Sequence, residues 1–137
     1  MYPEEMVSPM RMDLVSAGFT ELKTAEEAED CLNKMEGTTI VVVNSVCGCA
    51  AGNARPGVKL AVQNDKVPDN LTTVFAGVDS EATAIARSYF EPYPASSPSI
   101  ALFKEGKLVH FVERHHIEGS NAQMIADNLI SAFDEYC

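Results

Sequence analysis

The sequence predicts an α/β fold in which helices flank a four-stranded mixed β-sheet, with extra helices at the N-terminus. The run from Thr38 to Asn44 is β-branched up to its closing asparagine, which is typical of a central strand covered on both faces. Strand-like and helix-like segments alternate after it, which indicates parallel strands joined by crossover helices. Glu105-Gly106 separates two short apolar runs, and this hairpin signal adds antiparallel strands.

Two helices are expected before the first long strand. Pro9 to Gly18 has a proline at its first position and a glycine at its stop. A capping box precedes the second helix, which is expected over Ala25 to Met35. We therefore interpret residues 1–37 as an N-terminal helical extension and 38–137 as the core of a single domain. A chain of 137 residues is long enough for one buried core.

The core is expected to run strand, helix, strand, helix, strand, strand, helix. Pro56 lies inside the first of these helices and is expected to kink it. The segments predicted after the first strand are helix Ala50 to Asn64, strand Leu71 to Val78, helix Glu81 to Phe90, strands Ser99 to Lys104 and Lys107 to Glu113, and helix Asn121 to Glu135.

Charge and hydropathy limit the classes of partner that this protein can have. The formal net charge of −10 argues against nucleic acid, which needs a basic surface, and against anionic membranes. No cationic and apolar leader opens the chain, and its longest apolar run, Ile40 to Val43, is too short to span a bilayer. We therefore expect a cytoplasmic protein with no nucleic-acid or membrane partner.

Four cysteines occur, at positions 31, 47, 49 and 137. In a reducing compartment, clustered cysteines indicate redox chemistry or metal binding more often than structural bridges. Cys31 lies inside a predicted helix and is interpreted as a small buried apolar residue. Cys137 ends the chain, where an exposed terminal thiol is the commoner case and a third redox thiol is the alternative.

Cys47 and Cys49 follow the first strand directly, with Gly48 between them. The N–H groups and dipole of the helix that follows should stabilise a thiolate, so we expect a lowered cysteine pKa. Gly48 is expected to permit the unusual backbone of a very short disulfide ring. Such a ring is strained and therefore more easily reduced than a ring with two intervening residues. The pattern predicts a reactive thiol pair.

Other interpretations of the pair stay open at this point. Two cysteines can be buried and close without chemistry, as in an interaction protein that has lost its activity. A Cys-x-Cys pair also supplies two ligands of a metal or iron–sulfur site, whereas closed zinc sites need four. The residues available to complete one are His110, His115, His116 and Cys137. No second pair has metal-ligand spacing, so we expect no bound metal.

The segment Ser97 to Lys107 resembles thioredoxin-like proteins, with a proline before an apolar strand and a Lys-Glu-Gly-Lys turn. The resemblance implies that Pro98 is cis, that it faces the cysteines, and that the backbone of Ser97 pairs with bound substrate. Val41 stands where thioredoxins carry a buried acid, and the thioredoxin Trp-Cys-Gly-Pro-Cys motif is absent. Both departures weaken an assignment as a general disulfide reductase.

A narrower resemblance covers essentially the whole chain. The segments that carry it are Met1-Tyr2-Pro3, Val43 to Ala50, Arg55-Pro56-Gly57 and Ser97-Pro98-Ser99. Together they resemble the bacilliredoxin family. The resemblance implies a glutaredoxin-like activity that removes bacillithiol, a low-molecular-weight thiol, from the cysteines of client proteins. It also implies that no metal or organic cofactor is needed, with bacillithiol as the thiol co-substrate.

By this resemblance Cys47 attacks the mixed disulfide, and Cys49 or a second bacillithiol resolves it. A disulfide isomerase activity is the alternative use of the same pair. Arg55 is a candidate for contact with the carboxylates of bacillithiol, with a solvated helix residue as the alternative. The residues after the last strand, Arg114 to His116, are interpreted as a polar strand end.

Overall fold

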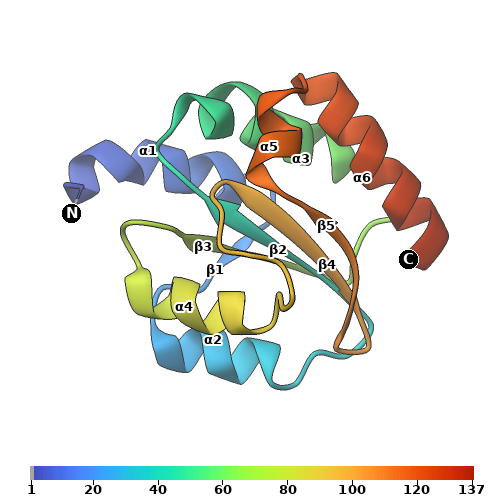
Figure 1. Ribbon diagram of the computed structural model, residues 1–137, viewed down its shortest axis with the longest axis horizontal. Helices are drawn as coiled ribbons and strands as arrows, with labels where there is room; N and C mark the ends of the chain where they lie inside the picture. Colours follow the sequence, from blue (N-terminus) through green and yellow to red (C-terminus); the bar gives the residue numbers. More distant parts are fainter. Residues whose placement is uncertain (1) are drawn as a thin grey trace.

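The computed structural model describes residues 2–137 and shows a single mixed sheet with helices on both faces (Figure 1). The elements in order are α1 (Glu4–Val15), β1 (Thr20–Glu21), α2 (Ala25–Leu32), β2 (Thr38–Asn44), the π-helical turn η1 (Ala50–Ala54), α3 (Arg55–Ala61), β3 (Asn70–Phe75), α4 (Ser80–Ser88), β4 (Ser99–Lys104), β5 (Lys107–Val112), α5 (Arg114–Glu118) and α6 (Ala122–Tyr136).

The predicted central strand is confirmed. β2 lies in the middle of the strand order β1-β3-β2-β4-β5, parallel to β3 and antiparallel to β4. All seven residues of β2 are buried. β4 and β5 form the expected hairpin, and its turn residues Glu105 and Gly106 both have positive φ. A β-branched strand without polar alternation fits this place because both of its faces are covered.

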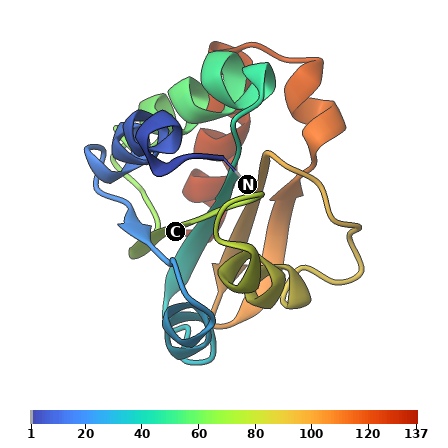
Figure 2. The same cartoon turned by 90° about the vertical axis from the view of Figure 1, so that its left-hand side faces the viewer.

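Two apolar clusters fill the space between the sheet and its helices. In Figure 2, α1, α3, α5 and α6 lie above the sheet, and α2 and α4 lie below it. Ile40 and Val42 pack into the upper cluster, whereas Val41 and Val43 pack into the lower one. Successive side chains of a strand point to opposite faces, so this single strand supplies both halves of the core.

The sheet has five strands and not the four expected. The additional strand, β1, pairs in parallel with β3 through Thr20 and Glu21. It comes from the segment interpreted as a purely helical extension, so residues 1–37 also contribute to the sheet. Two residues are too few to show a strand periodicity, which is why the sequence did not indicate this strand.

Most element boundaries agree with the expectation to within three residues, and α1 is the main exception. It begins at Glu4, and the carbonyl of Pro3 accepts hydrogen bonds from Met6 and Val7 at 3.0 and 3.3 Å. Pro9, expected to open the helix, lies inside it. Either proline suits a first helical turn by its fixed φ, so the sequence could not decide between them.

Pro56 does not kink an α-helix but follows a π-helical turn. The N–H of Arg55 donates to the carbonyl of Ala50, five residues earlier. Proline has no N–H, and in an α-helix its ring would clash with the carbonyl four residues before it, that of Gly52. A widened turn at this point removes the clash while the chain continues as a helix into α3.

The short helix α5 was not expected. Its residues were interpreted as a polar strand end, whereas the chain forms one helical turn opened by a capping box between Glu113 and His116. Five residues are too few for an apolar periodicity to identify a helix. Within residues 2–137, no helix combines the length and the apolar character needed to cross a membrane.

Candidate active site

Cys47 lies where β2 gives way to the helical segment, as the sequence predicted. β2 ends at Asn44, and the carbonyl of Cys47 accepts the N–H groups of Ala50 and Ala51 at 3.1 and 3.2 Å. Cys47 therefore takes the N-cap position, and the next amide groups have no partner within the helix. Unpaired N–H groups at a helix start favour a negative charge on the neighbouring sulfur.

The surroundings of Cys47 favour its thiolate. Partial burial acts to raise the pKa of Cys47, but several donors outweigh it, and the pKa falls below its ordinary value. The donors are the hydroxyl of Ser45 and the backbone amides of Ala50 and Cys49, and the positive charge of Arg114 acts in the same direction. The Ser45 oxygen also accepts the N–H of Cys47 at 3.2 Å, which fixes the hydroxyl beside the thiol.

Cys49 has the opposite character. Burial raises the pKa of Cys49, and the negative charges of Cys47 and Glu118 raise it further, while Arg114 opposes them. A hydrogen bond between the two thiols also holds the proton on Cys49. The site therefore favours ionisation of Cys47 over ionisation of Cys49, which is the order of acidity that stepwise thiol–disulfide exchange uses.

Both cysteines are free thiols in this structure, so the backbone expected of Gly48 in a short disulfide ring stays a prediction. Gly48 lies in the first helical turn and has no positive φ. A Cβ atom built on it would meet no atom within 4 Å. In this dithiol form the glycine therefore leaves open space beside the thiols and relieves no backbone strain.

The Ser97–Pro98 peptide bond is cis, as the resemblance to thioredoxin-like proteins implied. Ser99, at the start of β4, pairs with Val43, near the end of β2. Because the two strands are antiparallel, the loop before β4 and the cysteines after β2 lie at the same end of the sheet. A second cis bond, Glu91–Pro92, lies earlier in this loop and was not expected.

Arg55 occupies a place that neither sequence interpretation anticipated. Its side chain is buried, so it is neither solvated nor directed towards a bound thiol. Its Nε donates to Asp13 at 3.2 Å, and its Nη1 donates to Asn44 Oδ1 at 2.9 Å and to the carbonyl of Ser45 at 2.8 Å. Arg55 therefore supports the loop that leads to Cys47, and this corrects its assignment as a substrate contact.

Arg114, on α5, is the site residue that the sequence reading missed. Its Nη1 donates to the carbonyl of Ser97 at 3.1 Å, and its charge acts on both cysteines. The hairpin register is a signal that would have found it, because Val112 pairs with Ile100 at the start of β4. Counting on from that pair brings Arg114 next to the loop that holds Ser97.

The two remaining cysteines lie away from the pair. Cys137 ends α6 and hydrogen-bonds to Thr38, which begins β2, whereas Cys47 follows the end of that strand. Cys31 packs against the lower apolar cluster. Burial is the largest influence on both thiols and raises the pKa of each. In this structure neither is placed to exchange directly with Cys47.

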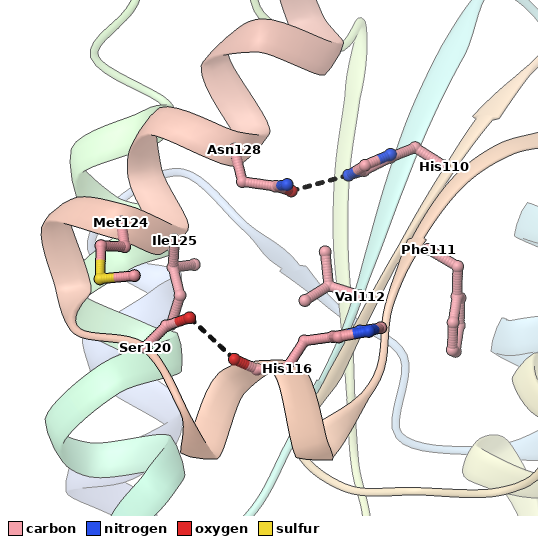
Figure 3. A pocket seen from close by; sticks show the side chains of 8 residues that line it. All are labelled: His110, Phe111, Val112, His116, Ser120, Met124, Ile125 and Asn128. Carbon is pink, nitrogen blue, oxygen red and sulfur yellow. Dashed lines mark hydrogen bonds between the residues drawn. The ribbon is translucent and has the colours of Figure 1, made fainter.

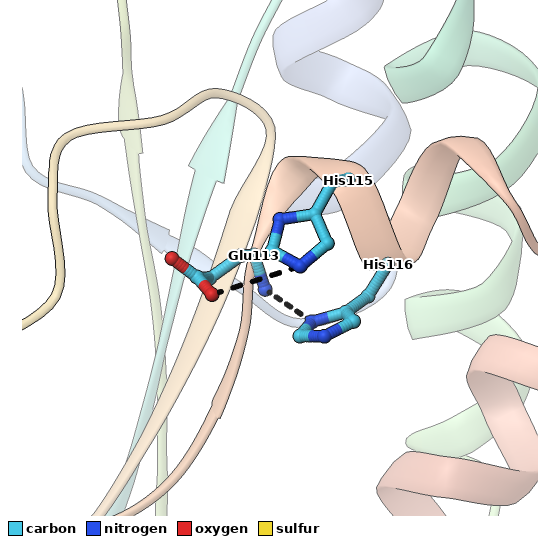
Figure 4. Close-up of side chains that lie close together, drawn as sticks. All are labelled: Glu113, His115 and His116. Carbon is cyan, nitrogen blue, oxygen red and sulfur yellow. Dashed lines mark hydrogen bonds and ion pairs between the residues drawn. The ribbon is translucent and has the colours of Figure 1, made fainter.

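The potential metal ligands gather elsewhere. Among residues 2–137, one cluster of three or more such groups occurs, formed by Glu113, His115 and His116 (Figure 4). Nε2 of His115 lies 3.9 Å from Glu113 Oε2, and the two imidazole rings are 4.1 Å apart. The cluster contains neither Cys47 nor Cys49, so these histidines do not complete a Cys-x-Cys metal set.

A groove of about 450 Å³ opens between β5 and α6 (Figure 3). His110, the remaining candidate ligand, lines it and is hydrogen-bonded through Nε2 to Asn128 Oδ1 at 2.8 Å. His116 and Met124 also line the groove, and no cysteine does. The thiol pair therefore lies outside this groove, partly exposed at the start of a helix.

Comparisons with known proteins identify the relatives of this chain. Residues 2–137 match a family model described as disulphide isomerase. A bacilliredoxin from Cytophaga hutchinsonii is 59% identical over 98% of this chain and 99% of its own. A bacilliredoxin from Geobacillus kaustophilus is 54% identical over 99% of this chain and 94% of its own. The similarity thus extends over nearly the full length of both relatives.

Solved structures give the fold. The mitochondrial thioredoxin 3 of Saccharomyces cerevisiae superimposes with a TM-score of 0.57 at 17% identity, covering 90% of this chain and 98% of its own. The thioredoxin of Fasciola hepatica superimposes with a TM-score of 0.57 at 20% identity, covering 84% and 99%. The protein has a thioredoxin-like fold.

Fold, thiol pair and relatives together define a thiol–disulfide oxidoreductase. The chain belongs to the bacilliredoxin family, as the resemblance of its cysteine and proline segments indicated.

Proposed function

We propose that this protein removes bacillithiol from mixed disulfides on client cysteines in the cytoplasm, with Cys47 as the nucleophile. The observation that carries the proposal is the difference between the two thiols, because the pKa of Cys47 is lowered and that of Cys49 is raised. The Cys47 thiolate attacks the bacillithiol sulfur of the mixed disulfide. A new disulfide then joins Cys47 to bacillithiol, and the client leaves as a thiolate that takes up a proton.

Cys49 is the resolving thiol in this proposal. Its pKa is raised partly by the negative charge on Cys47. That charge disappears once Cys47 carries bacillithiol, so the Cys49 proton is released more easily in the adduct than in the free enzyme. The Cys49 thiolate then attacks Cys47, the two residues become a disulfide, and bacillithiol leaves. A second bacillithiol attacking the adduct instead would yield bacillithiol disulfide and regenerate the Cys47 thiolate.

The substrate-binding surface in this proposal comprises Gly48, Ser97 and Pro98. The absence of a side chain at Gly48 leaves the approach to the thiols open. The cis-proline loop lies at the same end of the sheet, where the backbone of Ser97 can pair with the bound substrate. The exchange needs no metal or organic prosthetic group, because both electrons move between sulfur atoms.

The test uses a client protein that carries bacillithiol on one cysteine. Cys47→Ala should abolish release of the client thiol, whereas Cys49→Ala should release it and accumulate a bacillithiol adduct on Cys47, identified by mass spectrometry. Full activity in Cys47→Ala, or an adduct on Cys49 in place of Cys47, would reverse the assigned roles. Ser16→Ala serves as a control, because that hydroxyl contacts only Asp13 in an exposed turn.

Disulfide isomerisation is the second candidate, favoured by the description of the matching family model. Isomerisation requires Cys47 to attack a client disulfide and the client to leave in a rearranged form. Val41 is fully buried where thioredoxins carry an acid that assists proton transfer, so nothing at this position supports general disulfide reduction. Recovery of activity by a client with scrambled disulfides, compared with release of bacillithiol by the same preparation, separates the two functions.

A further inference from the structure

We propose that Arg114 forms an anion-binding subsite that recognises carboxylate groups on the small thiol transferred to Cys47. This inference rests on the proposed function, since it names the chemical feature of the adduct that the site selects. It gives Arg114 the role that the sequence reading assigned to Arg55.

The guanidinium of Arg114 has free donors. Of its five N–H groups, Nε donates to Glu118 and one on Nη1 donates to the carbonyl of Ser97. The remaining three have no partner among residues 2–137, and 44% of the side chain is exposed. Two parallel N–H groups suffice to bind a carboxylate in a bidentate geometry, which arginine favours.

Arg114 is also held in place before any ligand arrives. Its backbone N–H donates to Ser96 Oγ at 3.4 Å, and its Nη1 is fixed on the Ser97 carbonyl. Asn53 Nδ2 donates to the carbonyl of Ile117 at 2.9 Å, which ties α5 to the helical segment that begins at Cys47. A pre-positioned cation loses little conformational entropy on binding its ligand.

The charge around Cys47 makes such a cation useful. The chain carries a net charge of −10, which repels an anionic thiol as it approaches. Arg55 is buried and its contacts are all within the protein, and Lys59 is paired with Asp13 at 2.7 Å. Arg114 is bonded to the Ser97 carbonyl, in the loop that lies at the same end of the sheet as Cys47, and its positive charge acts on the Cys47 sulfur. An adduct on that sulfur is therefore formed on the side of the molecule where Arg114 lies.

Arg87 approaches the same loop from the other side and provides a matched control. Its Nη2 donates to the carbonyl of Ser96 at 3.4 Å, next to the Ser97 carbonyl that Arg114 holds. Its Nε is buried without a partner, so it faces the protein interior. If Arg114 acted only by supporting the loop, replacing Arg87 should have a similar effect on every adduct.

The experiment compares two mixed disulfides on the same client cysteine. One carries bacillithiol, with its carboxylates, and the other carries 2-mercaptoethanol, which is uncharged. The rate of client release is measured for each at one pH. The readout is the rate with bacillithiol divided by the rate with 2-mercaptoethanol. Arg114→Gln should slow both reactions, because the Cys47 thiolate loses a stabilising charge. This common effect cancels in the ratio, whereas the loss of a contact with the carboxylates of bacillithiol does not.

The ratio is expected to fall roughly three- to fivefold in Arg114→Gln, as for a solvent-exposed ion pair. Arg87→Gln should leave the ratio unchanged, and Glu118→Gln should raise it by removing the acid that competes for Arg114. Equal slowing of both adducts by Arg114→Gln would overturn the subsite and leave the proposed function intact. Failure of the unmodified protein to release either client would instead refute the proposed function.

Discussion

The hydroxyl of Ser45 offers the sharpest test of how this site produces a thiolate. It hydrogen-bonds to the Cys47 sulfur and accepts the N–H of Cys47 at 3.2 Å. Hydrogen bonds to charged groups contribute about 1.5–3 kcal/mol, and we take about 1 kcal/mol here because Cys47 is only partly buried. Ser45→Ala should therefore raise the pKa of Cys47 and lower its thiolate fraction about fivefold at pH values below that pKa.

The assay follows alkylation of Cys47 by iodoacetamide against pH, resolved by peptide mass spectrometry. Cys49→Ser is present throughout, so that the neighbouring thiol does not compete. The expected result is a pH profile displaced to higher pH in Ser45→Ala, while Ser88→Ala, whose hydroxyl bonds only within α4, leaves the profile unchanged. An undisplaced profile in a folded Ser45→Ala protein would refute the reasoning, and the helix start alone would then account for the thiolate.

Three further predictions concern packing, the buried cation and the second thiol. Gly57→Ala should lower the free energy of unfolding, measured by chemical denaturation, by about 1–2 kcal/mol, because its Cβ would lie 2.7 Å from an atom of α6. Gly52→Ala, which has open space around it, should be neutral or stabilising in the same assay. Arg55→Met should cost about 2–4 kcal/mol in the same assay, since it leaves the buried carbonyl of Ser45 unpaired and removes one of the two donors to Asn44 Oδ1. A loss below about 1 kcal/mol would contradict that role. Cys47→Ser should lower the pKa of Cys49 by removing a neighbouring negative charge, seen as alkylation of Cys49 at lower pH.

Local patterns located the thiol pair but not its supporting groups. The β-branched run of β2 and the residues after it placed Cys47 at a strand–helix junction, because both signals lie within a dozen residues. The partners of that junction are distant in sequence. Arg55 reaches Asp13 across 42 positions, and no local period records such a contact. The sequence therefore left Arg55 as either a substrate contact or a solvated helix residue, whereas it is buried and bonded within the protein.

The helix α5 was also missed because its sequence signal is too short and its contacts are made with residues distant in the chain. A single helical turn has no detectable period, so Arg114 to His116 resembled a strand end. The role of Arg114 depends on two interactions that form only after the β4–β5 hairpin folds back. One is its hydrogen bond to the Ser97 carbonyl, and the other is the effect of its positive charge on Cys47. The hairpin turn itself was evident from Glu105-Gly106, but the side chains that it brings together were not.

The sequence by itself determined the fold class, the central strand and the position of Cys47 and Cys49, because these features depend on short-range patterns. The cis bond at Pro98 came from the resemblance to thioredoxin-like proteins and not from a local pattern. Only the tertiary structure decided that Arg55 is buried, that Arg114 binds the loop at Ser97, and that β1 joins the sheet. Charge pairs and edge strands depend on which distant segments meet, and that is settled when the whole chain packs.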